Sequence, residues 1–207
     1  LYEGGKGQLE EYRADLLSDL DNSIEIGPTL SAAEHALAES AELIDSNDPV
    51  QLATALREII RVTANANMDS IMSSLEWRVY MSSLASLGSG ETLDPSVIEM
   101  FRDASREFGE RFVELFGHLC TTFGLRPRIP LDLAGFAVLV SATLEGVALR
   151  QPVEPRLGNL KRPTGPNDQP QSWNAGAVAV EGIVITWLEP DPEAAASADL
   201  STWIAFG

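Results

Sequence analysis

The chain has 207 residues, 44% of them hydrophobic, so it is long enough for one large domain or two small ones with a sizeable core. Its 31 acidic and 14 basic residues give a formal net charge of -17, which makes this stretch a poor binder of nucleic acid by itself. Cys120 is the only cysteine, which excludes an internal disulfide and fits a reducing, cytoplasmic compartment.

Apolar residues recur at helical spacing through almost the whole chain, and period-two alternation is nearly absent. We therefore expect an all-α fold. The predicted helices, in chain order, cover about residues 8–26, 30–45, 48–64, 67–87, 94–123, 131–150 and 172–189. Gly27-Pro28 is expected to end the first helix, and the pairs Asp48-Pro49 and Asp94-Pro95 are expected to start the third and the fifth.

Two segments lie outside this helical pattern. Residues 151–171 hold five prolines and have local basic character, so the loop at 152–171 is either partly disordered, which we favour, or an ordered excursion. The tail that ends in "LSTWIAFG" is apolar for a terminus, and we expect it to dock onto the body or onto a partner.

The helices predicted at 131–150 and 172–189 are apolar and unusually rich in small residues. Asp132, Glu145 and Arg150 argue against a membrane span at 131–150, so we expect a buried helix and no membrane association. A glycine inside a helix costs roughly 1 kcal/mol relative to alanine, which close approach of another helix would offset.

Two arrangements explain these smooth helices. They are core helices of a monomer, or they meet the same pair from a second copy in a symmetric four-helix interface. The candidate interface residues are Gly135, Ala142, Gly146, Ala175, Ala179 and Gly182.

Met and aromatic residues are concentrated at 67–87, which suits a pocket for a mostly apolar small molecule or, equally, ordinary core packing. Glu76 would favour a cationic or hydroxylated ligand if it is buried. The candidate ligand-binding residues are Met72, Glu76, Trp77, Tyr80, Phe108, Phe112, Phe116, Leu119, Phe136 and Val140.

Catalytic and metal-binding patterns are absent from the sequence. There is no His-Glu-x-x-His or Gly-x-Ser-x-Gly motif, and "GGKG" at 4–7 follows no strand, so we expect a turn there rather than a phosphate loop. His118 and Cys120 stand two residues apart and so face different sides of a helix, which predicts a buried, inert thiol and leaves His118 as a possible hydrogen-bond donor to a ligand. We predict no enzyme activity, no cofactor and no metal site.

Three stretches resemble the ligand-binding and dimerisation domain of TetR-family transcriptional regulators. "LYEGGKGQL" at 1–9 is similar to the family's junction after the recognition helix, although Tyr2 and Lys6 stand two residues closer than is usual and the family's Phe is absent. "LEWRVYMSSLAS" followed by "LDP" at 75–95 is similar to the family's long helix and the start of the next one. "GLRPRIPLDLAGFAVLVSATLEGVALR" at 124–150 is similar to its penultimate helix.

The resemblance covers nearly the whole chain and implies that residues 1–207 form a single ligand-binding and dimerisation domain, with 1–9 as the remnant of a junction. It further implies a homodimer formed by the last two helices, a small-molecule effector bound among the middle helices, and operator DNA bound by a helix-turn-helix domain upstream of Leu1. The alternatives are a helical enzyme or a lipid or small-molecule carrier with an apolar cavity, and a structural helical module without a pocket.

Overall fold

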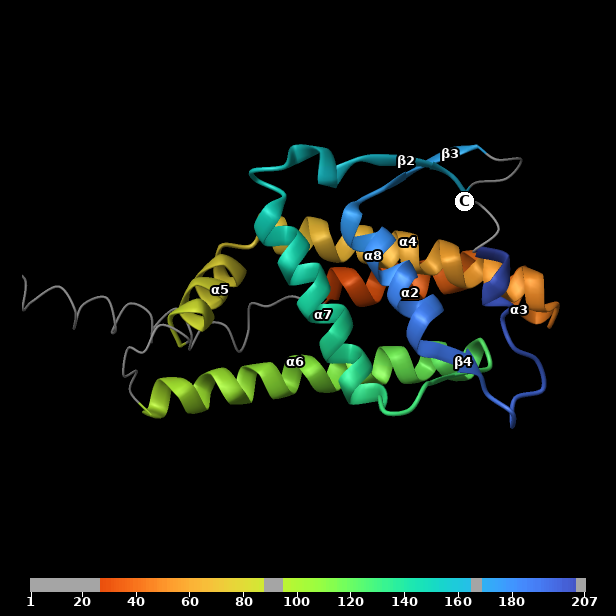
Figure 1. The fold of residues 1–207 in the computed structure, drawn as a ribbon, viewed down its shortest axis with the longest axis horizontal. Coiled ribbons are helices and arrows are strands. Elements are labelled where there is room, and N and C mark those ends of the chain that lie inside the picture. The colour runs from red at the N-terminus through yellow and green to blue at the C-terminus, as the bar shows by residue number, and fades with distance from the viewer. Residues whose placement is uncertain (1–26, 88–94, 165–168, 204–207) are drawn as a thin grey trace, which may run out of the picture.

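The computed structural model describes residues 27–87, 95–164 and 169–203 (Figure 1). Its helices are α2 (Gly27–Glu39), α3 (Ala41–Asp45), α4 (Pro49–Ser73), α5 (Leu75–Leu87), α6 (Pro95–Thr122), α7 (Leu133–Arg150) and α8 (Ala175–Trp187), with the 3-10 turns η1 (Pro155–Gly158) and η3 (Leu200–Trp203). Two small antiparallel sheets pair β1 (Leu125–Pro127) with β4 (Leu188–Pro190) and β2 (Leu160–Pro163) with β3 (Pro170–Trp173). The described chain is thus mostly helical, as predicted, but the strands were not predicted.

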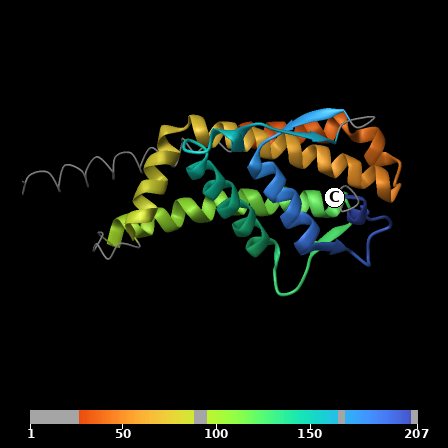
Figure 2. The same ribbon diagram turned by 45° about the horizontal axis from the view of Figure 1, so that its top comes forward.

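The helix α4 is at the centre of the fold. The helix α2 lies along it, α8 packs against it, and α7 contacts α4, α6 and α8 (Figure 1). The helix α6 runs along the opposite side of the molecule from the β2–β3 hairpin, and α5 lies at one end in both views (Figures 1 and 2). The core therefore forms mainly between α2, α4, α6, α7 and α8.

The N-cap predicted at Asp48 is confirmed, and Asp132 caps α7 in the same way. Asp48 Oδ1 accepts hydrogen bonds from Val50 N at 3.1 Å and Gln51 N at 2.9 Å at the start of α4. Asp132 Oδ1 accepts from Gly135 N at 2.7 Å at the start of α7. Each carboxylate satisfies backbone N–H groups that have no partner inside the helix. The helix α6 also begins at the proline of the predicted Asp-Pro pair.

Two predicted boundaries near the start of the described chain are wrong. The helix predicted from residue 30 already includes Gly27 and Pro28 in α2, where proline's missing N–H is no loss in the first turn. The predicted end of the preceding helix depends on residues that the structure does not describe. The helix predicted at 30–45 is interrupted at Ser40 between α2 and α3. The helix predicted at 8–26 lies outside the described residues.

The predicted break between residues 64 and 67 is also wrong. The helix α4 continues to Ser73, and the break falls at Ser74. Asparagine favours helix ends and turns over helix interiors, but Asn65 Nδ2 donates to the Ser172 carbonyl at 3.2 Å. This hydrogen bond to a distant strand helps to hold the helical backbone where the local sequence predicts an end.

The proline-rich segment is an ordered excursion in its described part. It contains η1 and most of the β2–β3 hairpin, while residues 165–168 lie outside the described residues. The last predicted helix therefore begins later than residue 172, since Trp173 belongs to β3. Asn174 caps α8 by accepting from Ala177 N at 2.7 Å.

The expected docking of the tail onto the body is confirmed as far as residue 203. Ala198 N donates to the Phe123 carbonyl at 3.0 Å, and Asp199 N donates to the Pro49 carbonyl at 2.9 Å. Trp203 is buried against the core. The tail thus fastens the ends of α4 and α6.

Candidate functional site

A small apolar cavity lies in the core between five helices. The space open to the centre of a water molecule is about 40 Å³, about three times what one water needs on that measure. Its walls are Thr29 from α2, Ile59, Ile60, Thr63, Ala64 and Asn67 from α4, Phe112, Leu115, Phe116 and Leu119 from α6, Val140 and Leu144 from α7, and Val180 from α8. Because most of these side chains are hydrocarbon, the cavity suits a small apolar molecule.

One wall of the cavity is built from stacked phenylalanines. Phe108, Phe112 and Phe116 recur every four residues on one face of α6, with ring centroids 4.8 Å and 5.8 Å apart. Phe116 meets Phe136 of α7 edge to face, with centroids 5.2 Å apart. Such pairs contribute about 0.5–1.5 kcal/mol each beyond their buried area, so this wall is stiff and joins α6 to α7.

The cavity wall also includes three side chains with polar atoms. Asn67 Nδ2 donates to Thr29 Oγ1 at 3.1 Å, so α4 and α2 are joined by a buried hydrogen bond. Thr63 Oγ1 is buried and has no hydrogen-bond partner among the described residues. A buried polar group without a partner lowers the stability of the fold by about 1–3 kcal/mol, so this hydroxyl destabilises the folded chain.

The structure brings part of the predicted ligand-binding set together. Phe112, Phe116, Leu119 and Val140 line the cavity. Phe108 and Phe136 are not part of the lining but pack against Phe112 and Phe116, respectively, as ring partners. Helical spacing along α6 was the signal that located this wall correctly.

The residues predicted from 67–87 lie elsewhere. Met72 belongs to α4 and is half-buried, Trp77 is buried, and Tyr80 is half-buried, but none of the three lines the cavity. The side chain of Glu76 lies outside the described residues. The concentration of Met and aromatic residues therefore marks packing of α5 rather than this cavity.

A polar cluster joins α5, α6 and α7 instead. Tyr80 Oη and Ser105 Oγ are 2.8 Å apart and share a hydrogen bond. Burial raises the pKa of Tyr80, and the nearby Glu145 carboxylate adds to that rise. Burial likewise raises the pKa of Glu145. Both groups therefore hold their protons to higher pH than they would in water.

The sequence did not predict the α4 side of the cavity. Ile59, Thr63 and Asn67 follow one another at intervals of four and so share one face of α4. This spacing was a usable signal, but the helix break predicted between residues 64 and 67 divided it.

The small residues predicted for a dimer interface divide into two groups. Ala142, Gly146 and Gly182 are exposed, and a Cβ added at either glycine would meet nothing within 4 Å. Gly135, Ala175 and Ala179 are half-buried. The exposed residues of α7 are Ala134, Val138, Ala142, Gly146, Leu149 and Arg150. The exposed stripe is thus apolar until its last residue, which is unusual for the surface helix of a monomer.

Gly176 shows the other use of a small residue, inside the monomer. A Cβ there would lie 2.8 Å from Leu144 Cδ2 and 3.1 Å from Met68 Cγ. Since these distances are shorter than ordinary van der Waals contacts, Gly176 allows α8 to approach both α7 and α4. Both arrangements considered from the sequence therefore have residues that fit them.

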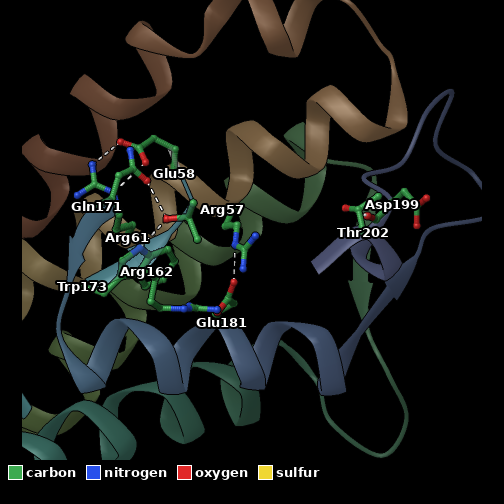
Figure 3. A network of polar contacts seen from close by, with 10 residues as sticks. Arg57, Glu58, Arg61, Arg162, Gln171, Trp173, Glu181, Asp199 and Thr202 are labelled. Atoms are coloured by element: carbon green, nitrogen blue, oxygen red, sulfur yellow. Dashed lines mark hydrogen bonds and ion pairs between the residues drawn. The ribbon is translucent and has the colours of Figure 1, made fainter. Parts of the chain in front are cut away.

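A buried ion-pair network fastens α8 to α4 and to the β2–β3 hairpin (Figure 3). Glu181 of α8 is 4% exposed and lies between Arg57 of α4 and Arg162 of β2. Arg162 also covers the ring of Trp173 at 4.6 Å from its centroid. The sequence alone gives no signal of this network, because its members lie far apart in the chain.

The predicted buried thiol is confirmed, and no metal site is seen in the described part of the chain. Burial raises the pKa of Cys120 to about 11, so the unreactive thiol form prevails at neutral pH. His118 is exposed and lies outside the cavity wall. Within residues 27–87, 95–164 and 169–203, no three His, Cys, Asp or Glu side chains are placed to hold a metal ion.

Comparisons with known proteins do not extend this description. A scan against protein-family models, a search of curated proteins and a search of solved structures each found no match. By length and composition α7 is also apolar enough to cross a membrane, a property that core helices of soluble proteins share. A functional proposal for this chain therefore rests on the geometry of its fold.

Proposed function

We propose that this chain is the effector-binding and dimerisation domain of a TetR-like transcriptional regulator. One observation carries the proposal: the same two helices line the cavity on one side and carry exposed small residues on another. In α7, Val140 and Leu144 line the cavity while Ala142 and Gly146 are exposed. In α8, Val180 lines the cavity while Gly182 is exposed.

This arrangement supports a coupling between ligand binding and subunit geometry. A molecule larger than the present 40 Å³ space has to move a wall. The phenylalanine stack stiffens the α6 wall, and Val180 belongs to the shorter helix α8. A ligand that binds the expanded arrangement more tightly shifts the equilibrium towards that arrangement, in which α8 is displaced. A difference in binding free energy of a few kcal/mol between the two arrangements is sufficient.

The exposed faces of α7 and α8 support a homodimer. Val138 and Leu149 are 66% and 54% exposed on α7, beside Ala142 and Gly146. A second copy would cover these apolar groups by packing its own α7 and α8 against them in a two-fold four-helix interface. Small side chains would let the helix backbones approach closely.

The charge of the chain supports a DNA-binding domain that is separate from this one. A net charge of -17 repels DNA, so in this proposal the DNA-reading surface belongs to a basic helix-turn-helix domain upstream of Leu1. Movement of α7 and α8 across the dimer would change the spacing of two such domains.

A carrier or enzyme with an apolar cavity is the second candidate. The apolar cavity itself favours it, but a space of about 40 Å³ is far below the roughly 300–1,000 Å³ of ordinary ligand sites and is too small for a lipid chain. A lipid carrier therefore requires a much larger opening than the space that the structure shows.

The decisive experiment examines the DNA that encodes the residues upstream of Leu1. We expect a basic helix-turn-helix there, and a protein comprising both parts should bind a two-fold operator as a dimer in a gel-shift assay. An upstream sequence with no such motif, or a full protein without DNA affinity at low salt, would leave the carrier as the better proposal.

A further inference from the structure

The hydroxyl of Thr63 is the feature of the cavity that apolar packing does not explain. Thr63 lies on α4 among the cavity-lining residues, and its Oγ1 is buried without a hydrogen-bond partner among the described residues. A valine has the same shape and would fill this position without leaving a polar atom unpaired. The hydroxyl is thus available to a molecule that enters the cavity.

The other polar side chains of the wall are already engaged with each other. Asn67 Nδ2 donates to Thr29 Oγ1 at 3.1 Å, and both residues are buried. Ile59, Ile60 and Val140, also in the wall, offer only carbon. Thr63 Oγ1 is therefore the polar side-chain atom of the described wall that is buried without a hydrogen-bond partner.

Water does not suit this lining. A stable buried water makes two to four hydrogen bonds, whereas Thr63 Oγ1 is the one unpartnered buried side-chain oxygen that the described lining shows. A molecule with a hydrocarbon body and one oxygen satisfies the cavity better, because the oxygen pairs with the hydroxyl and the body contacts the surrounding carbon atoms.

We infer that the cavity recognises short aliphatic molecules that carry a single hydroxyl or carbonyl oxygen, and that Thr63 Oγ1 binds this oxygen. This inference rests on the proposed effector site and adds the chemical class of its ligand. The 40 Å³ space holds about as much as three water molecules, so ethanol fits with little movement of the walls and the longer butan-1-ol fits after a modest outward movement of one wall.

The test compares two probes of similar shape, butan-1-ol and 1-chlorobutane, by NMR titration of the methyl groups of Ile59, Ile60 and Val140, which line the cavity. The Thr63→Val variant should bind butan-1-ol about five-fold more weakly than the wild type, the effect of one typical hydrogen bond. Its affinity for 1-chlorobutane should be unchanged or higher. The difference between the probes separates the hydrogen bond from a general change in packing.

Two control variants complete the design. Thr63→Ser keeps the hydroxyl and should retain the butan-1-ol affinity. Thr54→Val makes the same substitution at an exposed residue of α4, where Thr54 Oγ1 donates to the Val50 carbonyl at 2.9 Å, and should change neither affinity. Thr63→Val should fold at least as stably as the wild type, because it removes an unpaired hydroxyl.

The outcomes distinguish this inference from the proposed function. Equal changes for both probes, or an unchanged butan-1-ol affinity in Thr63→Val, would overturn the role of Thr63 while leaving an apolar effector site in place. If neither probe shifts any cavity methyl group at millimolar concentration, the cavity is not a ligand site, and the inference and the effector site of the proposed function fail together.

Discussion

Arg57 Nε on α4 donates to Glu181 Oε1 on α8 at 2.5 Å, with the two side chains only 12% and 5% exposed (Figure 3). The other carboxylate oxygen of Glu181 pairs with Arg162 of the β2–β3 hairpin. One buried carboxylate thus joins three parts of the chain that are distant in sequence. Glu181 comes directly after Val180, which lines the cavity. The position of α8 beside the cavity therefore depends on the ion pairs of Glu181.

Replacing Glu181 by glutamine should lower the free energy of unfolding by about 3 kcal/mol. Two guanidinium groups would lose their anion, and removing one partner of a buried ion pair costs about 3–5 kcal/mol. The lower end applies because Arg162 retains partial access to water. Urea unfolding followed by circular dichroism measures the change.

Glu189→Gln is the matched control for Glu181→Gln. Glu189 pairs with Arg126 at 3.0 Å, but the two side chains are 34% and 50% exposed. Solvent-accessible pairs contribute about 0–1 kcal/mol, so this variant should unfold close to the wild type. Equal losses of unfolding free energy in the two variants would show that the buried Glu181 network stabilises the fold no more than an exposed ion pair does.

The proposed dimer predicts a specific effect of bulk on α7 and α8. Gly146→Leu and Gly182→Leu should each raise the dissociation constant of the dimer by about five-fold or more, since clashes in a packed interface cost about 1–3 kcal/mol. Each glycine has open space beside it within the monomer, so the subunit itself should fold. Sedimentation velocity over a range of concentrations measures the association.

Gly109→Leu on α6 is the control for these substitutions, because a Cβ at Gly109 also meets nothing within 4 Å. It should leave the association unchanged. A wild-type chain that sediments as a monomer at every concentration, or dimers unaffected by both α7 and α8 variants, would contradict the proposed interface.

Gly176 should tolerate a side chain poorly. The Cβ introduced by Gly176→Val would lie 2.8 Å from Leu144 Cδ2 and 3.1 Å from Met68 Cγ. This crowding should lower the free energy of unfolding by about 1–3 kcal/mol. Gly109→Ala should instead stabilise the protein by up to about 1 kcal/mol through helix propensity. Thermal unfolding of the two variants beside the wild type tests the contrast; a neutral Gly176→Val would mean that α8 can shift away from α7 freely.

The thiol of Cys120 predicts a loss of stability at alkaline pH. Burial raises its pKa from the usual value of 9.0 to about 11 in the folded chain. In the unfolded chain the thiol ionises from about pH 9, while the folded chain keeps the proton until about pH 11. The stabilising contribution is therefore complete below pH 9 and is lost as the pH rises from 9 towards 11.

Urea unfolding at pH 8, 9 and 10 measures this dependence. Between pH 9 and 10 the free energy of unfolding of the wild type should fall more steeply than that of Cys120→Ala, which lacks the titrating group. Parallel slopes for the two proteins would indicate that the thiol has the same pKa in the folded and unfolded chains.

The candidate site was only partly accessible from the sequence. The α6 and α7 walls followed from helical spacing, which correctly placed Phe112, Phe116 and Val140 together. The α4 wall did not, because asparagines in the middle of α4 have a low helix propensity and suggested an end there. The concentration of Met and aromatic residues near Trp77 indicated a buried surface but not which surface encloses a space.

The sequence by itself determined those features that depend on contacts between residues close together in the chain. The cap at Asp48 and the periodic faces of α6 and α7 depend on neighbours in the chain, so local spacing is sufficient to predict them. The tertiary structure alone decided that α4 runs on through Asn67, that Glu181 joins three elements, and that a cavity remains between five helices. These features depend on partners up to 124 positions apart in the chain, as for Arg57 and Glu181, and on how closely whole helices can approach one another, which local patterns do not encode.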